Sequence, residues 1–216
     1  MTYRIDALLT GRARRFGAQG EASAIAKAPV LGPRRVGFLG IDGDEQADLS
    51  VHGGPDKAVH HYPRDHYPFW AETLGGHALL GTPGAFGENV STEGLVEEIA
   101  CLGDRYRLGS ALIEISQGRQ PCWKLGHRFG DARVPAMVVR TGKSGWYYRV
   151  IEEGDVAAGD ALRLVDRPLP EWPVARLFRL VIGGAGKGEP AALRELAGLE
   201  VLAGNWRKRV EKLLGG

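Results

Sequence analysis

The sequence is poor in cysteine, with two in 216 residues, and neither sign of charge is in clear excess. Two cysteines are too few for a disulfide scaffold, and in a chain without an export signal they indicate free thiols in a reducing compartment. Lys and Arg number 28 against 26 Asp and Glu. The resulting net charge of +2 argues against general nucleic-acid binding, which needs a strong basic excess.

Long apolar runs are also missing. No stretch reaches the ~18 uninterrupted apolar residues of a membrane helix, and the longest charge-free stretch, residues 73–87, is broken by glycines, His77 and Pro83. Arg4 and Asp6 lie where a secretory signal would be apolar. The sequence therefore predicts a cytoplasmic protein without membrane partners, of one to two domains.

Glycine is abundant, at 32 residues, and the glycines stand singly between short apolar runs. This pattern is typical of short strands joined by tight turns. We expect a hairpin of Arg105–Leu108 with Ala111–Gln117, a second strand pair of Met137–Thr141 with Gly145–Ile151, and a strand at Ala161–Val165. Few helices interrupt these strands, one of them expected at Arg64–Leu74. The fold class predicted for residues 1–166 is mainly β, closed or sandwiched.

The composition changes after Asp166, where three prolines space a connector. Apolar residues then recur at helical spacing. They predict three short helices, over Val174–Ile182, from Glu189 through Leu196, and around Trp206 to Leu214. The expected division is a β domain at 1–166 and a small helical domain at 167–216.

Cys122 follows a predicted strand and a loop broken by glycine and proline, at a point where a helix can begin. A free thiol has a pKa of ~8.5 and is ionised at neutral pH only with help from cations or a helix N-terminus. Arg119 and Lys124 are cations close to it in the sequence. A buried cysteine beside Trp123 is an equally open interpretation, whereas Cys101, at an apolar strand end, is expected in the core.

Five of the six histidines fall between positions 52 and 77, several of them close to glycines. In the segment His52-Gly53-Gly54-Pro55, glycines allow backbone N–H groups to approach an anion, and Lys57 adds charge. A plain glycine hairpin with solvated imidazoles is the alternative. A zinc site of His60, His61 and His66 is also conceivable, although no His-Glu-x-x-His motif or paired cysteine supports it.

Two single polar residues complete the candidates. Asn89 lies in a short Gly-Glu-Asn turn that can aim an amide at a ligand, although most such turns are only turns. Lys27 is one cation among small apolar residues on an expected strand ahead of Pro29. Such a lysine usually extends to solvent.

Three ordered segments carry a resemblance to a known family: GDEQADLSVHGGPDKAVHHYP, GENVSTEGL and GDRYRLGSALIEISQGRQPCWKL. They resemble the MOSC domain family (molybdenum cofactor sulfurase C-terminal domain), in particular its small stand-alone bacterial branch typified by YiiM. The resemblance extends over about residues 20–165. It implies a β-barrel-like domain with a positively charged pocket for the molybdenum cofactor, a pterin that bears a dithiolene and a phosphate. The C-terminal helices resemble the three-helix appendage of that branch.

The resemblance also implies roles for individual residues. Cys122 would be the thiolate ligand of molybdenum or a carrier of persulfide sulfur, with Lys27 and Arg119 beside it. Residues expected to contact the cofactor are His52, Gly53, Lys57, His60, Tyr62, Asn89, Ser116, Gln117 and Lys124. The branch usually has Ser-Gln-Pro-Arg where this chain has Gly118, so the loop before Arg119 lacks the φ restraint of proline.

The function implied is a molybdenum-dependent oxidoreductase that converts N-hydroxylated compounds, such as hydroxylaminopurine-type bases, to amines. Its electrons would come from a separate redox protein, because the sequence shows no flavin or iron–sulfur motif. A sulfur carrier with a persulfide on Cys122 is the first alternative. A binding module for another phosphate-bearing ligand, with a structural Cys122, is the second. The sequence leaves a monomer and a homodimer equally open.

Overall fold

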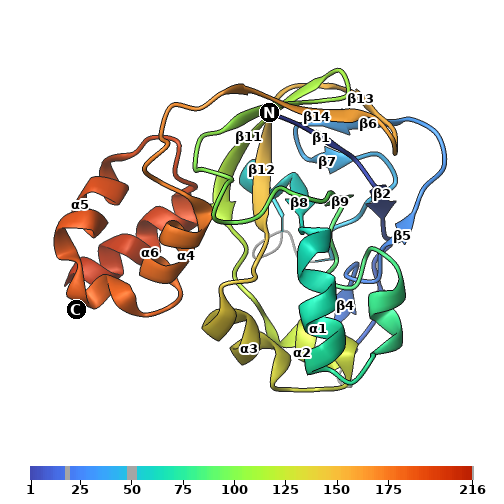
Figure 1. The fold of residues 1–216 in the computed structure, drawn as a ribbon, viewed down its shortest axis with the longest axis horizontal. Helices are drawn as coiled ribbons and strands as arrows, with labels where there is room; N and C mark the ends of the chain where they lie inside the picture. The colour runs from blue at the N-terminus through green and yellow to red at the C-terminus, as the bar shows by residue number, and fades with distance from the viewer. Residues whose placement is uncertain (18–19, 48–52, 216) are drawn as a thin grey trace.

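One strongly curled sheet dominates the first 166 residues of the computed structural model, which describes residues 1–17, 20–47 and 53–215 (Figure 1). The sheet has nine strands and closes about half of a barrel, and all neighbours but β8 and β9 run antiparallel. In spatial order the strands are β1 (Thr2–Arg4), β14 (Ala161–Asp166), β10 (Arg105–Leu108), β11 (Ala111–Gly118), β12 (Trp146–Glu152), β8 (Val59–His61), β9 (Val90–Ser91), β2 (Ala7–Thr10) and β5 (Ala28–Pro29).

Smaller elements surround this sheet. A three-stranded sheet and a two-stranded hairpin comprise β13 (Gly154–Val156), β6 (Arg34–Gly37), β7 (Gly40–Ile41), β3 (Arg14–Arg15) and β4 (Ala22–Ser23). The α-helices are α1 (Tyr67–Thr73), α2 (Trp123–Phe129), α3 (Val134–Thr141), α4 (Val174–Val181), α5 (Pro190–Gly198) and α6 (Gly204–Gly215). Short 3-10 turns are η1 (Pro55–Lys57), η2 (Arg64–His66), η3 (Ala78–Gly81) and η4 (Ala185–Gly188). The predicted mainly β fold is confirmed, and no helix of the described residues is long and apolar enough to cross a membrane.

Glycine turns produce the strands that the sequence predicts. β10 and β11 form the expected hairpin, with Leu108 opposite Ala111 across a turn at Gly109, whose φ is 58°. Gly103 and Gly159 also have positive φ, and a strand begins two residues after each of them. Such backbone angles cost glycine little, so each turn can reverse the chain within a few residues.

The predicted strand at Met137–Thr141 is wrong, because these residues belong to helix α3. Its buried side chains, Val134, Met137 and Val138, recur at spacings of three and four, which is helical periodicity. Pro135 suits the first turn, and Gly142 ends the helix in the left-handed conformation. Without that partner, β12 pairs instead with β11 and β8. The helix expected at Arg64–Leu74 is present as η2 followed by α1.

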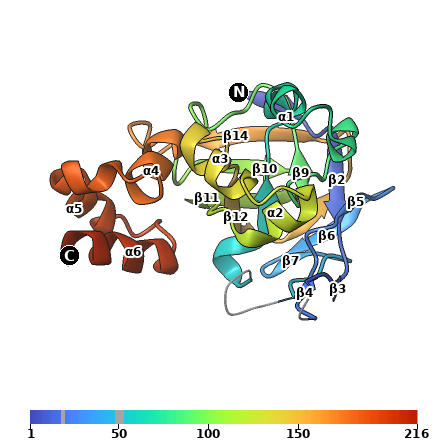
Figure 2. The ribbon, with the colours of Figure 1, turned by 90° about the horizontal axis from the view of Figure 1, so that it is seen from below.

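The chain after β14 forms the three predicted helices, α4 to α6, which lie together beside the sheet in both ribbon views (Figure 1, Figure 2). They share one apolar cluster with α1 to α3, in which Trp206 and Phe178 belong to the same buried group as Tyr62 and Phe86. Backbone bonds also join the two parts, since the Ala203 N–H donates to the Ser116 carbonyl at 3.0 Å. A second apolar cluster fills the inside of the curled sheet.

The turn between α3 and β12 fixes the end of β11. Both N–H groups of Ser144 and Gly145 donate to the buried Glu97 carboxylate, at 2.8 and 2.7 Å. The Gly145 carbonyl in turn accepts from the Arg119 N–H at 3.0 Å. Gly145 has φ 69°, and a Cβ there would lie 2.3 Å from the His61 carbonyl oxygen. The close approach of two backbone segments thus requires glycine at this position.

We expect Gly145→Ala to lower the free energy of unfolding by about 3 kcal/mol or more, because backbone strain and a clash with backbone add together. Gly142→Ala is the matched control, since Gly142 has φ 73° but a Cβ there would meet nothing within 4 Å. That variant should lose only about 1 kcal/mol. Urea unfolding of both variants measures the difference, and equal losses would contradict the close approach.

Candidate functional site

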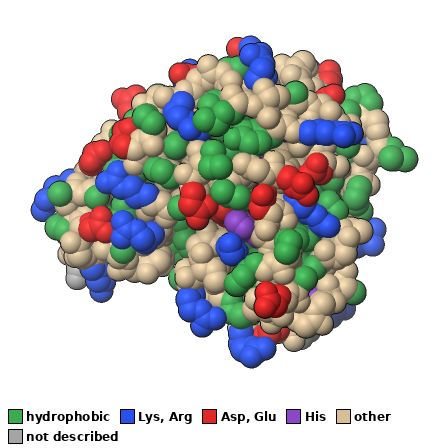
Figure 3. All heavy atoms as spheres, in the orientation of Figure 1, with side chains coloured by type: hydrophobic (Ala, Val, Ile, Leu, Met, Phe, Trp, Pro, Cys, Tyr) green, Lys and Arg blue, Asp and Glu red, His purple; other side chains and the backbone are tan. Residues whose placement is uncertain are grey.

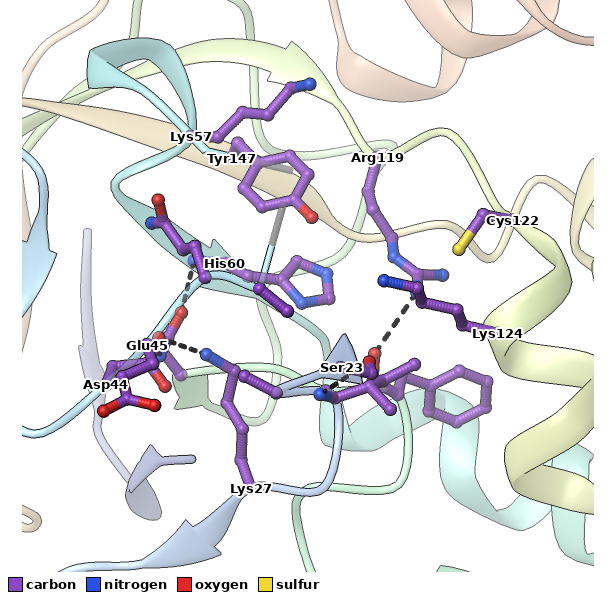
Figure 4. A pocket seen from close by; sticks show the side chains of 17 residues that line it. Ser23, Lys27, Asp44, Glu45, Lys57, His60, Arg119, Cys122, Lys124 and Tyr147 are labelled. Carbon is purple, nitrogen blue, oxygen red and sulfur yellow. Dashed lines mark hydrogen bonds and ion pairs between the residues drawn. The ribbon is translucent and has the colours of Figure 1, made fainter. Parts of the chain in front are cut away.

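A hollow opens where β8, β11 and β12 come near the start of α2, and we call it the cationic hollow (Figure 4). It encloses about 580 Å³ of unoccupied space, its open mouth included. Figure 4 shows Arg119 and Lys27 reaching in from opposite sides with His60 between them, and Cys122 on the side of α2. The charged lining residues are Lys27, Lys57, Arg119, Lys124, Asp44 and Glu45. Four cations against two carboxylates favour an anionic ligand, whereas charges of both signs are interspersed on the face shown in Figure 3.

Lys27 is the most constrained of these cations. Its ammonium is ion-paired with Asp44, and their side chains are 8% and 4% exposed. Asp44 is itself held by the Gly11 N–H at 2.7 Å and by Asn89 Nδ2 at 2.8 Å. Burial lowers the pKa of Lys27, while Asp44 and then Glu88 oppose that shift. Lys27 is outside any strand, and the expectation that it extends to solvent is wrong.

Arg119 presents an unsatisfied guanidinium. The side chain is buried, and its Nη2 donates to the Phe86 carbonyl at a long 3.4 Å. Its Nη1 has no hydrogen-bond partner among the described residues. A buried guanidinium with donors to spare is a strong site for a phosphate or carboxylate oxygen.

His60 lies at the back of the hollow as a neutral imidazole. Asn89 fixes its backbone, since the His60 N–H donates to Asn89 Oδ1 at 3.0 Å and the Asn89 N–H donates to the His60 carbonyl at 2.8 Å. Burial holds the pKa of His60 well below its usual value, and Arg119 lowers it further. Its Nε2 is buried with no hydrogen-bond partner among the described residues.

Cys122 is a partly buried free thiol directly before α2, and its side chain does not cap that helix. Lys124, at the start of α2, is buried and donates from Nζ to the Ala22 carbonyl at 3.1 Å. Tyr147 completes this wall with its ring centroid 4.9 Å from that of His60. Burial raises the pKa of Tyr147. The nearby charge of Arg119 opposes this shift, and Cys122 adds to it. The thiol, the guanidinium and the phenol thus share one environment.

The hollow brings together most, but not all, of the residues that the sequence suggested. Lys27, Lys57, His60, Asn89, Arg119, Cys122 and Lys124 line it. Tyr62 does not, because it is fully buried in the apolar cluster and stacks on Phe86 at 4.0 Å. Ser116 points elsewhere too, donating from Oγ to the Asp56 carbonyl at 2.6 Å. Gln117 lines a neighbouring hollow, Gly53 lines neither, and His52 lies outside the described residues.

The three histidines of the zinc alternative face different partners. His61 contacts the Tyr148 hydroxyl through Nδ1 at 2.9 Å and the Thr92 hydroxyl through Nε2 at 3.0 Å. His66 Nε2 pairs with Glu97 at 2.6 Å. Over residues 1–17, 20–47 and 53–215, no three or more His, Cys, Asp or Glu side chains are grouped to hold a metal ion. The histidines that the sequence clusters are therefore separated by the fold.

Cys101 is a core residue, as the sequence indicates. Its side chain is buried, and the thiol contacts the Ile99 and Pro170 carbonyls at 3.6 Å. Burial, and then the nearby Asp104 carboxylate, raises the pKa of Cys101 to about 11. Cys101 is thus buried away from the cationic hollow, whereas Cys122 is a partly buried residue that lines it.

Comparison with known proteins identifies the family. The family model of the MOSC domain matches residues 48–163, which is more than half of the chain. The chain belongs to the MOSC domain family. It therefore contains a domain of the type associated with the molybdenum cofactor, and the predicted resemblance is confirmed.

Individual relatives of this MOSC chain span most of its length. Protein YiiM of Escherichia coli (strain K12) is 46% identical over 167 residues, which cover 77% of this chain and 74% of that protein. A protein of Gibberella moniliformis named "Reductase" is 40% identical over 173 residues, 79% of this chain but 31% of its own length. The crystal structure of YiiM from Geobacillus stearothermophilus superposes with a TM-score of 0.83 at 33% identity, covering 98% and 99% of the two chains.

The residues of the cationic hollow fit the molybdenum cofactor. Arg119 and His60 each keep a buried nitrogen without a partner among the described residues, which suits an oxygen-rich anion. The Cys122 thiol is a soft donor that suits a metal already bound by sulfur. The residues that sequence reasoning left without a role are Asp44, which fixes Lys27, and Tyr147, which adjoins Cys122. The acidic run 42–48 pointed to Asp44 in the sequence, whereas no local sequence pattern pointed to Tyr147.

The buried neutral histidines make a specific prediction for pH dependence. Burial lowers the pKa of His61 to about 3. As the pH falls below about 6.5, His61 therefore becomes protonated in the unfolded chain but stays neutral in the folded chain. The free energy of unfolding should therefore fall as the pH decreases from 6.5 towards 3, by up to about 1.4 kcal/mol per pH unit for this residue. His61→Gln should flatten the dependence by that amount between pH 6 and pH 4, measured by urea unfolding.

The control is His77→Gln, which removes a partly exposed imidazole, and comparison of the two slopes isolates the effect of burying His61. A His61→Gln slope equal to that of the parent would show that this imidazole is not held neutral by burial.

Proposed function

We propose that this MOSC protein binds the molybdenum cofactor in the cationic hollow and reduces N-hydroxylated compounds, hydroxylaminopurine-type bases among them, to amines. Family membership supports the cofactor, and similarity to a protein named "Reductase" supports the type of reaction. The observation that carries most weight is the meeting of a partly exposed thiol with an excess of cations in one hollow. A soft sulfur ligand beside a site for a phosphate is the donor set that such a cofactor needs.

Some residues of the hollow would bind the cofactor, and others would form hydrogen bonds to the reacting group. Arg119, Lys27 and Lys57 would bind the anionic part, and Cys122 would be the sulfur ligand. When bound, the cofactor would supply oxygen-atom-transfer chemistry and a change of metal oxidation state, so the hard redox chemistry would belong to it. Burial raises the pKa of Tyr147, so its hydroxyl stays protonated and can donate a hydrogen bond to the departing oxygen. His60, buried and held neutral by its low pKa, can form a hydrogen bond with a bound group without taking up charge.

The reaction consumes two electrons and two protons. The N–O bond of the hydroxylamine breaks, an N–H bond forms, and the oxygen leaves as water. A chain with two cysteines cannot supply the four thiolates of an iron–sulfur cluster. The electrons would therefore come from a separate redox protein, as the sequence led us to expect, and monomer and homodimer are both compatible with this scheme.

Replacement of the proposed ligand should remove both metal and activity. In Cys122→Ser, purified from a host that makes the cofactor, we expect molybdenum content and hydroxylaminopurine reduction to fall by more than about 100-fold, because loss of a direct metal ligand costs more than loss of a residue that only orients one. Elemental analysis and a reductase assay measure the two. Cys101→Ala is the matched control, a buried thiol outside the hollow, and should keep its molybdenum and its turnover.

The same purification separates the proposal from the sulfur-carrier alternative, which the accessible position of Cys122 also favours. Stoichiometric molybdenum on the parent protein supports the reductase. A mass increase of one sulfur atom on Cys122, without molybdenum, would replace it with the carrier. Full reductase activity in Cys122→Ser would refute the role of this residue in either scheme.

A further inference from the structure

A second hollow lies on the other side of Cys122, and we call it the amide hollow. It encloses about 540 Å³ of unoccupied space, its open mouth included. Lys57, Cys122 and Tyr147 line both hollows and so form the wall between them. The far side is lined by the side-chain amides of Gln117, Gln120 and Asn205. A group bound to the Cys122 sulfur would therefore be open to two different spaces.

The two spaces differ in chemistry. The cationic hollow has six charged lining residues, whereas Lys57 is the one charged residue that lines the amide hollow within the described part of the chain. Gln117 is 1% exposed, and its Oε1 has no partner among the described residues. A buried acceptor without a donor is costly. Gln117 lines the amide hollow together with Gln120, Asn205 and Trp206. A wall of amides and one aromatic ring suits an uncharged planar molecule with N–H or O–H donors.

Helix α6 supplies one wall of the amide hollow, through Asn205 and Trp206. Its position is coupled to the end of β11, since a Cβ on Gly118 would lie 2.9 Å from the Trp206 ring. Gln120, in the loop before Cys122, accepts from Arg209 of α6 at 3.4 Å. The C-terminal helices thus reach the loop that carries the candidate ligand.

We propose that the amide hollow is the substrate subsite, completed by helix α6, and that it takes uncharged planar heterocyclic bases that carry N–H or N–OH groups. The inference deepens the proposed function and rests on it for the reaction. The anionic part of the cofactor occupies the cationic hollow, the base occupies the amide hollow, and Cys122 lies between them. Gln117 and Asn205 then determine specificity.

Adenine, the product expected from hydroxylaminopurine, is the probe, and its binding to the protein is measured by titration calorimetry without turnover. Asn205→Trp fills the amide hollow from an exposed helix position and should weaken adenine binding by at least about tenfold. The matched variant is Gln46→Trp, which replaces another amide but lines the cationic hollow. It should bind adenine as the parent does and retain less molybdenum.

A second variant tests the buried acceptor. Gln117→Leu removes an oxygen that has no partner among the described residues and one long hydrogen bond, from Nε2 to the Gly118 carbonyl at 3.3 Å. The melting temperature should therefore change by no more than about 2 °C. Adenine binding should nevertheless weaken about five- to tenfold, as expected for the loss of one hydrogen bond to the ligand. A purely structural Gln117 would produce the opposite result, a lower melting temperature with unchanged adenine affinity.

The results separate this inference from the proposed function. Absence of adenine binding to the parent protein, or a loss in Gln46→Trp but not in Asn205→Trp, would overturn the subsite. A loss confined to the amide-hollow variants supports it. Molybdenum content and hydroxylaminopurine reduction of the parent protein test the reaction itself, so a parent protein that binds adenine in the amide hollow but lacks molybdenum would refute the reductase alone.

Discussion

The candidate site depends on the buried ion pair between Lys27 and Asp44. Removing two charges from water is expensive, and such a pair persists only when further hydrogen bonds satisfy it. Gly11 and Asn89 provide these bonds, and Asn89 also bonds the backbone of His60 in both directions. One carboxylate thereby links the N-terminal strands to β8 at the back of the hollow. Loss of either partner would leave an unpaired buried charge. It would therefore destabilise the fold as well as disturb the site.

The opposite wall is fixed by backbone N–H groups, two of which donate to a buried carboxylate. The Glu97 carboxylate holds the Ser144–Gly145 turn, and this turn accepts the N–H of Arg119. The Arg119 side chain then keeps donors to spare, since its bond to Phe86 is long and Nη1 is unsatisfied among the described residues. The backbone hydrogen bond of Arg119 thus fixes its position, while its guanidinium keeps free N–H donors for a ligand.

The sequence was informative where the determinants are local. Glycine turns marked the β10–β11 hairpin, prolines and helical spacing marked the C-terminal helices, and the loop before Trp123 marked the start of α2. The expected strand pair of Met137–Thr141 with Gly145–Ile151 missed helix α3, whose apolar spacing is helical. Tyr62 could not be assigned from alternation, because it follows β8, whose residues Val59–His61 are all buried. The acidic run 42–48 marked Asp44 but not its partner Lys27, and no local pattern marked Tyr147, because both placements depend on tertiary structure.

The contact between Gly118 and Trp206 has a consequence for how such chains can diverge. The ring occupies the space that a side chain at 118 would need, and each position belongs to a different part of the molecule. A lineage that acquires a bulkier residue at the first position must trim the aromatic at the second or tilt the helix that bears it. We therefore expect the size of residue 118 and the size of residue 206 to constrain each other.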